Sequence, residues 1–291
     1  MSFNLEKMYK LPPGDRFFDF NEIWYFFNRW AIRALYPSPV TANQITLLSL
    51  VMGLAAAGFY LSDFRDGLVW AAVFLYGKIF LDNVDGNLAR VRGEVSRVGR
   101  FFDSLTDFWV TFAVYGAITC HLFQESQEPL FWVIGGFALL SGLFHCSYFV
   151  FYLVSYTATV GTYRMNRVRE DITEEDQRLS SRGESEAGIL WMQRLHVWLY
   201  GWQDRAIEIF DGFSQTLAGV TNRPDDQKNW YLDKRFLTWI SPLCLCTNNM
   251  ILVIFSLLDD LAMGLWMVLL GNIYLLGIQA WKIFHHRFNS A

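Results

Sequence analysis

Residues 82–107 of this 291-residue chain read DNVDGNLARVRGEVSRVGRFFDSLTD and lie between two apolar stretches. The segment contains two pairs of aspartates, Asp82 with Asp85 and Asp103 with Asp107. Spacings of three and four residues place both carboxylates of a pair on one face of an α-helix. The short connection after Arg90 can fold the two helices antiparallel, so that all four carboxylates converge. The segment therefore predicts two helices with an acidic site between them.

An acidic site of this kind needs counter-charge, because four carboxylates close to a bilayer repel one another and resist ionisation. Ligands that are all oxygen favour Mg²⁺ or Mn²⁺. Two such ions, typically about 3.5 to 4 Å apart, stabilise the attacking and leaving oxygens of phosphoryl substitution. We therefore expect a divalent metal site with two ions. The alternatives are aspartates that pair with nearby arginines, or the ion pathway of a transporter.

The complete pattern of the segment is D-x2-D-G-x2-A-R-x8-G-x3-D-x3-D. It resembles the signature of the CDP-alcohol phosphotransferase (CDP-alcohol phosphatidyltransferase) family at every specified position. The resemblance implies an integral membrane enzyme that transfers a phosphoalcohol from a cytidine diphosphate donor to a second alcohol and releases CMP. It implies that Asp82, Asp85, Asp103 and Asp107 hold the metal ions. Asp107 also matches the residue proposed to remove the proton of the acceptor hydroxyl.

The same resemblance places the cytidine part of the donor beside Gly86, Ala89 and Arg90. Gly86 has no side chain, so a nucleotide can approach the helix closely, and Arg90 can pair with phosphate. Gly99 is interpreted as a packing residue between the two motif helices. The resemblance also implies a homodimer, and nothing in the sequence indicates a nucleic-acid partner.

Over the whole chain 53% of the residues are hydrophobic and 18% are aromatic, which fits a large globular domain or a compact membrane bundle, and the distribution of the apolar residues indicates the membrane bundle. Six apolar runs have roughly the 20 residues that a bilayer core requires. They are residues 42–61, 67–81, 108–123, 129–156, 237–258 and 261–284. We predict an all-α integral membrane protein with a six-helix transmembrane bundle and an N-terminal interfacial amphipathic helix.

The predicted organisation has four parts. Residues 16–36 mix aromatic and charged side chains before two prolines, which is typical of a helix lying on the membrane surface. Residues 189–217 are amphipathic in the same way. The first part, 1–40, is an N-terminal cytosolic or interfacial helix, and the second, 41–158, contains transmembrane helices one to four with the motif. The third part, 159–236, is a cytosolic insertion with an amphipathic helix. The fourth part, 237–291, contains transmembrane helices five and six with a short cytosolic tail.

The distribution of basic residues predicts the orientation, because Lys and Arg accumulate on the cytoplasmic side of membrane proteins. The motif loop carries Arg92, Arg97 and Arg100, whereas Arg65 is the only basic residue in a predicted outside connection. We therefore expect both termini and the active site to face the cytoplasm, in a prokaryotic cell membrane or a eukaryotic endomembrane.

Two weaker signals leave alternatives open. Lys78 lies one turn before Asp82 on the same face, where it either balances the carboxylates, contacts an anionic acceptor, or forms a buried salt bridge only. Asn43 and Thr46 resemble a Pro-Asn-x-x-Thr element of the family in which Ala42 replaces the proline. Helix capping by Thr41 or Asn43 explains this segment equally well.

The favoured function is phospholipid biosynthesis, with a phosphatidyl-type group moving from a CDP-linked lipid to a small polar alcohol. Six spans form a wide apolar enclosure, which suits a donor whose chains stay in the bilayer. The runner-up is transfer of phosphoethanolamine or phosphocholine to diacylglycerol. Outside this class, an ion-coupled membrane transporter and a non-catalytic membrane scaffold remain as alternatives.

Overall fold

The computed structural model describes residues 3–161, 167, 170–181, 187–221 and 223–289. Within these ranges every regular element is a helix and none is a strand, which confirms the all-α prediction. The chain divides into two compact units. Unit 1 comprises Met1–Tyr9, Asn21–Leu143 and Leu245–Asn272, and unit 2 comprises Lys10–Phe20, Phe144–Cys244 and Ile273–Ala291.

Several helices are long and apolar enough to cross a membrane. Among the described residues there are four, or up to five if one broken pair of helices counts as a single span. The four are α2 (Ala42–Tyr60), α3 (Gly67–Arg92), α5 (Leu130–Val160) and α11 (Leu261–Asn289). Each contains one of the predicted apolar runs, so an integral membrane protein is the class that these helices indicate.

The broken pair replaces the continuous span predicted at 237–258. It consists of α9 (Lys234–Ile240), the short 3₁₀ helix η4 (Ser241–Leu243) and α10 (Leu245–Leu257). Pro242 lies in η4, and a proline ring lacks the N–H that an α-helix needs. Cys244 then has an extended backbone, with φ −64° and ψ 161°. Hydropathy alone does not register such a backbone break.

The remaining predicted span, 108–123, lies inside α4 (Arg97–Ser126), which is not apolar enough to count among the candidates. Its N-terminal turns carry the charged motif residues, and its interior includes Thr111 and Thr119, both buried. The expected number of six spans depends on α4 and stays a prediction.

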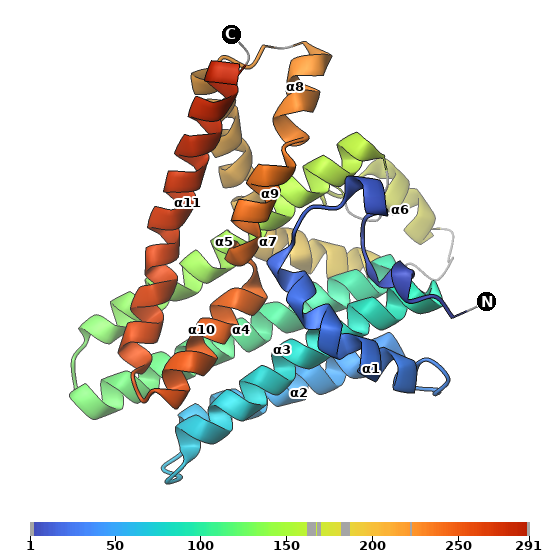
Figure 1. Cartoon of the computed structure of the whole chain (residues 1–291). Helices are drawn as coiled ribbons and strands as arrows, with labels where there is room; N and C mark the ends of the chain where they lie inside the picture. The colour runs from blue at the N-terminus through green and yellow to red at the C-terminus, as the bar shows by residue number, and fades with distance from the viewer. Residues whose placement is uncertain (1–2, 162–166, 168–169, 182–186, 222, 290–291) are drawn as a thin grey trace. The chain divides into compact units, whose positions relative to one another are not determined.

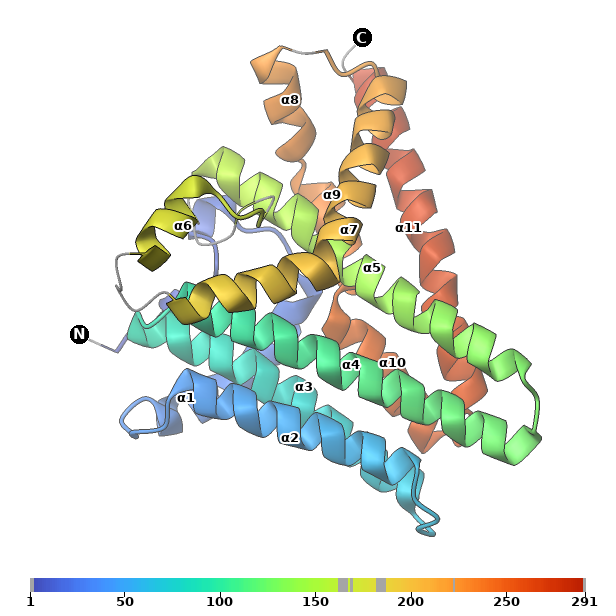
Figure 2. The same ribbon diagram turned by 180° about the vertical axis from the view of Figure 1, so that it is seen from behind.

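Unit 1 is built on α2, α3 and α4, which run side by side (Figures 1 and 2). Small residues permit close packing, since a side chain at Gly53 of α2 would collide with Val110 of α4. The α3–α4 connection is tight: Gly93 ends α3 in the left-handed conformation, with φ 72°. Ser96 then caps α4 by accepting a bond from the Gly99 N–H at 3.1 Å. This turn brings the two halves of the motif together.

The N-terminal segment of unit 1 crosses α3. Helix α1 (Tyr25–Leu35) follows the 3₁₀ helix η3 (Phe20–Trp24) and buries Tyr25, Asn28 and Ile32. Its other face exposes Phe26, Phe27 and Trp30. Helix η1 (Leu5–Met8) also packs on α3 (Figure 1). The amphipathic helix predicted at 16–36 thus begins later, and its place at the membrane surface stays a prediction.

The connection between α1 and α2 is fastened to α3 by one arginine. The guanidinium of Arg92 donates to the carbonyl oxygens of Leu35, Ser38 and Val40 at 2.5, 2.8 and 2.6 Å. These carbonyls follow the end of α1, where backbone acceptors lack helical partners. Arg92 therefore holds the α1–α2 connection against the end of α3.

Unit 2 contains α6 (Glu174–Ser181), α7 (Ala187–Ala218) and α8 (Pro224–Tyr231), together with α9 and η2 (Pro13–Asp15). Helix α7 covers the amphipathic helix predicted at 189–217. It exposes Trp191, Trp198 and Trp202. Indole rings of this kind are enriched at membrane–water interfaces, and the membrane-bound location of α7 remains a prediction.

The core of unit 2 is organised by one carboxylate and one ammonium. Asp211 accepts bonds from Tyr152 Oη at 2.6 Å and Trp230 Nε1 at 2.9 Å. The ammonium of Lys282 lies over the rings of Tyr152, Trp230 and Phe236, at 4.0, 4.1 and 3.9 Å from their centroids. Lys282 is only 2% exposed, so these rings provide its cation–π partners inside the protein.

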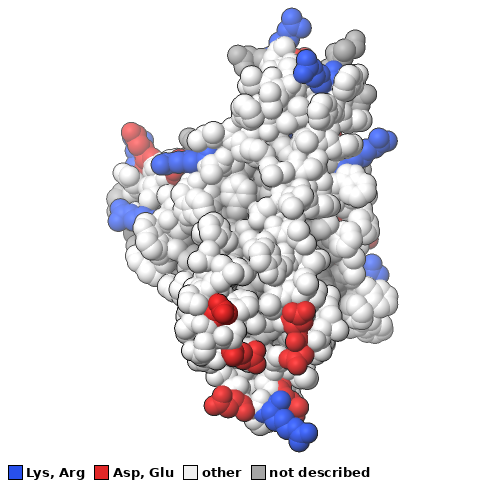
Figure 3. Space-filling view, turned by 90° about the vertical axis from the view of Figure 1, so that its left-hand side faces the viewer, with Lys and Arg blue, Asp and Glu red and all other residues white. Residues whose placement is uncertain are grey.

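The connections of unit 1 that lie away from the motif are acidic. The α2–α3, α4–α5 and α10–α11 connections carry one basic residue, Arg65. Figure 3 shows acidic side chains gathered at one end of the face it views. This asymmetry is the one on which the predicted orientation rests, and the orientation itself remains a prediction.

Candidate metal and nucleotide site

Three of the four motif carboxylates come together between α3 and α4. Asp82, Asp85 and Asp103 each offer one oxygen, and these atoms all lie within 4.8 Å of one another. Asp85 is only 4% exposed, and Asp82 is 14% exposed. The two helices present these side chains as the spacing in the sequence predicted.

Asp85 is held from α2. The Thr46 hydroxyl lies 2.5 Å from Asp85 Oδ2, and both side chains are buried. Helix α2 is capped by Thr41, which accepts from the Gln44 N–H, while Gln44 Oε1 accepts from the Thr41 N–H at 2.9 Å. Capping is thus the task of Thr41, whereas the Thr46 hydroxyl lies 3.1 Å from the Ala42 carbonyl oxygen and closer to the carboxylate of Asp85.

Asp107 lies outside that group of three and pairs with Lys78. The Lys78 ammonium donates to Asp107 Oδ1 and, at 2.9 Å, to Asp82 Oδ1. Lys78 is 2% exposed and Asp107 is 19% exposed. The structure therefore places an internal cation between the two aspartate pairs. The roles of Asp107 as metal ligand and base stay predictions.

The residues present fit a hard divalent cation. The buried Asp103 Oδ1 has no hydrogen-bond partner among the described residues. Buried carboxylate oxygens are costly without a donor or a cation. Asp82, Asp85 and Asp103 would hold the ion through oxygen alone, as Mg²⁺ and Mn²⁺ prefer.

The predicted nucleotide residues lie on the next turn of α3. Arg90 donates through Nε to the Met8 carbonyl at 2.7 Å and through Nη2 to Asn87 Oδ1 at 2.5 Å. A Cβ built on Gly86 would lie 3.4 Å from Arg90 Nη1. Gly86 and the Nη1 donor are therefore adjacent, while Nε and Nη2 donate to other groups of the protein.

Asn87 was missed by reasoning from the sequence. It is fully buried and precedes Arg90 by three residues, so both share a face of α3. That spacing within the motif was the signal available. No pattern in the sequence indicated the contact of Arg90 with the Met8 carbonyl, because the two residues are far apart in the chain.

Gly99 was predicted to lie between the two motif helices, but its neighbour on another helix belongs to α2. A Cβ at Gly99 would lie 3.3 Å from Asn43 Oδ1 of α2. The glycine therefore permits close approach of α4 to α2, in addition to shaping the start of α4.

We predict that Gly86→Leu weakens CMP binding at least about tenfold, which is roughly 1.4 kcal/mol. A leucine side chain extends well beyond the Cβ position, which already lies 3.4 Å from Arg90 Nη1, and it would fill the surface where the nucleotide is expected. CMP affinity is measured calorimetrically on folded protein in detergent. Gly58→Leu is the matched control, because Gly58 of α2 has open space around it. Equal CMP affinity in both variants would place the nucleotide elsewhere.

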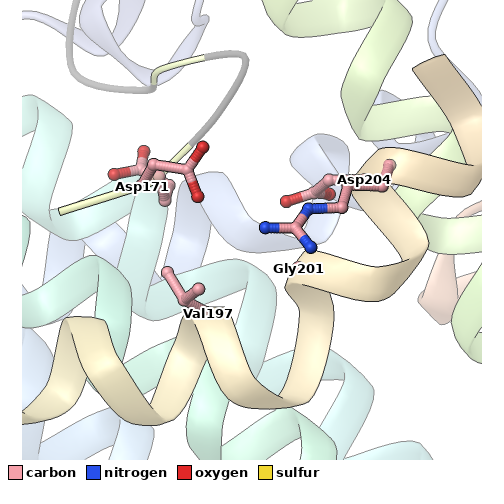
Figure 4. Close-up of a pocket in the computed structure, with 6 residues that line it drawn as sticks. Asp171, Val197, Gly201 and Asp204 are labelled. Atoms are coloured by element: carbon pink, nitrogen blue, oxygen red, sulfur yellow. The ribbon is translucent and has the colours of Figure 1, made fainter.

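A separate small pocket lies in unit 2. Val197, Gly201 and Asp204 of α7 line one side, and Asp171 lines the other (Figure 4). Glu170 and Arg205 complete the lining. None of these residues belongs to the motif, and the pocket presents both acidic and basic groups to a narrow space.

These features define a helical membrane protein with an oxygen-only acidic centre beside an open glycine surface. Comparison with known families agrees, since residues 39–174 match the family model described as CDP-alcohol phosphatidyltransferase. This part of the chain contains α2, α3 and α4 with the complete motif. Residues 39–174 are therefore similar to the CDP-alcohol phosphatidyltransferase family.

Individual relatives are similar over part of the chain. An archaetidylinositol phosphate synthase of Pyrococcus horikoshii is 41% identical over 69 residues, which are 23% of this chain and 35% of that protein. A bifunctional IPC transferase and DIPP synthase of Aquifex aeolicus is 32% identical over 108 residues, 37% of this chain and 23% of that protein.

A third relative is a CDP-diacylglycerol–serine O-phosphatidyltransferase of Mycobacterium leprae. It is 32% identical over 94 residues, 32% of this chain and 30% of that protein. The chain thus covers well under half the length of these relatives.

Proposed function

We propose that this protein is an integral membrane transferase that moves a phosphatidyl-type group from a CDP-linked lipid to a small polar alcohol and releases CMP. The observation that carries the proposal is the convergence of Asp82, Asp85 and Asp103 within 4.8 Å, in a segment that matches the family. The family resemblance supports a homodimer, and the charge asymmetry supports an active site on the cytoplasmic side.

The proposed reaction is substitution at phosphorus. The hydroxyl oxygen of the acceptor forms a bond to the lipid-bearing phosphorus of the donor, and the bridging P–O bond breaks. CMP leaves with the electron pair of that bond. A divalent ion held by Asp82, Asp85 and Asp103 would supply charge stabilisation to the diphosphate. Asp107 accepts the proton of the attacking hydroxyl.

Two observations favour a lipid-linked donor over the runner-up. Two of the similar proteins are named as an archaetidylinositol phosphate synthase and a CDP-diacylglycerol–serine O-phosphatidyltransferase, and the second name contains a CDP-linked lipid. The apolar helices α2 and α3 flank the carboxylates, which suits acyl or isoprenoid chains that remain in the bilayer. A transporter would explain the carboxylates, but it needs neither Gly86 nor Arg90.

The proposal is tested in liposomes that contain the purified protein. A CDP-linked lipid with a panel of alcohols (glycerol phosphate, inositol phosphate, inositol, serine) should yield CMP and one new phospholipid. Activity should require Mg²⁺ or Mn²⁺ and vanish on chelation. CDP-ethanolamine or CDP-choline with diacylglycerol should yield nothing. The reverse pattern would support the runner-up, and silence in both assays would refute an enzyme of this class.

A further inference from the structure

Lys78 is the cation that the motif does not contain. It lies on α3 one turn before Asp82, between Leu75 and Ile79, both fully buried in the hydrophobic core of unit 1. Its ammonium bonds to Asp82 Oδ1 at 2.9 Å and to Asp107 Oδ1. Lysine is almost never fully buried unless it is paired. This lysine is paired with the two aspartates that begin and end the motif.

A second ion that used both Asp82 and Asp107 as ligands would have to lie close to the Lys78 ammonium, which contacts the same two carboxylates. In two-metal sites the ions are roughly 3.5 to 4 Å apart and act on both reacting oxygens. An ion serving Asp107 and bridging to the group of three would have to contact Asp82 as well. The Lys78 ammonium already bridges these two side chains.

A doubly charged ion and the ammonium exclude one another from this place. Their repulsion would be twice that of two single charges at equal distance. Moving the Lys78 ammonium away from these two aspartates would cost much free energy, because an unpaired ammonium in an apolar core is strongly unfavourable. The group of Asp82, Asp85 and Asp103 remains available for one ion, and it contains the unpartnered Asp103 Oδ1.

We infer that Lys78 takes the place of a second divalent ion, so that the protein binds one ion through Asp82, Asp85 and Asp103. This inference rests on the proposed function, and it differs from the two ions expected from the sequence. Lys78 is then a positioning residue: its ammonium fixes Asp107 and supplies positive charge at the side of the site where the acceptor hydroxyl is to be deprotonated.

The test counts bound Mn²⁺ on detergent-purified protein, by equilibrium dialysis with elemental analysis. Wild type should bind one ion per chain. Lys78→Met should bind two, because Asp82 and Asp107 are then open to a second ion. The Lys78→Met/Asp107→Asn double variant should return to one. Lys282→Met, which removes another lysine of 2% exposure, is the control and should stay at one.

Asp107→Asn alone keeps the test decisive if Lys78→Met does not fold. Since Asp107 is not a ligand in this arrangement, the variant should bind one ion with an affinity within about threefold of wild type. Two ions in wild type, loss of an ion in Asp107→Asn, or one ion in folded Lys78→Met would each overturn the inference.

The outcome is independent of whether the proposed reaction is correct. If wild type binds one ion but releases no CMP from any donor, the proposed function fails and the inference about Lys78 stands. If wild type binds two ions and releases CMP, the reverse holds. Lys78→Arg, which keeps the positive charge, should bind one ion, and a second ion in that variant would also count against the inference.

Discussion

Asp85→Asn and Asp103→Asn will each lower the rate of CMP release by roughly a thousandfold or more. A bound divalent ion contributes several kcal/mol of charge stabilisation in the transition state, and about 4 kcal/mol corresponds to a thousandfold. Both side chains belong to the group of three whose oxygens lie within 4.8 Å. An amide retains one acceptor oxygen but loses the negative charge that attracts the cation.

The measurement is CMP release under saturating donor and acceptor, with Mn²⁺ affinity as the second readout. Asparagine has nearly the shape of aspartate, and the Thr46 hydroxyl can still donate to it, so Asp85→Asn is expected to fold. Asp259→Asn is the matched control, because Asp259 lies in the α10–α11 turn with φ 57°, a conformation that asparagine also tolerates. Rates near wild type in folded Asp85→Asn or Asp103→Asn would exclude this metal centre.

The spacing of the motif predicted that four aspartates converge, and the structure groups three of them, with Asp107 outside the group. Asp82 and Asp85 share a face of α3, and the tight turn at Gly93 presents Asp103 to them. The spacing did not predict how residues outside the motif contact its aspartates. Thr46 had two explanations until α2 was seen to be capped by Thr41. Lys78 likewise had three, of which the pairing with Asp82 and Asp107 is observed.

The limits of the fold prediction have physical reasons. Hydropathy averages over a run of residues, so it reported a continuous span where Pro242 and Cys244 interrupt the helix. It also placed a span in α4 without weighing the buried threonines that lower its apolar character. The Arg90 contact with Met8 joins the start of the chain to the motif, and no local pattern announces such a pair.

Asp107 differs in its surroundings from the three aspartates that would hold the ion. Lys78 fixes Oδ1, and the residue lies outside the group of three that would hold the ion. A carboxylate within reach of the attacking hydroxyl can act as a general base. Asp107 is therefore the carboxylate that we propose as the base for the acceptor hydroxyl.

We accordingly expect Asp107→Asn to keep CMP affinity within about threefold of wild type while transfer falls roughly 100-fold to 10,000-fold, the range attributed to general base catalysis. Asparagine can still accept the bond from Lys78, so the site keeps its shape but loses its proton acceptor. CMP affinity is measured by calorimetry and transfer by CMP release.

Asp107→Glu is the companion variant for this experiment. It retains a carboxylate but moves it by one methylene, and its rate should lie between those of wild type and Asp107→Asn. If Asp107→Asn transfers at the wild-type rate, another group removes the proton. If it loses CMP binding together with transfer, Asp107 serves the donor, and the separation between the metal group and the Lys78–Asp107 pair does not describe how the site works.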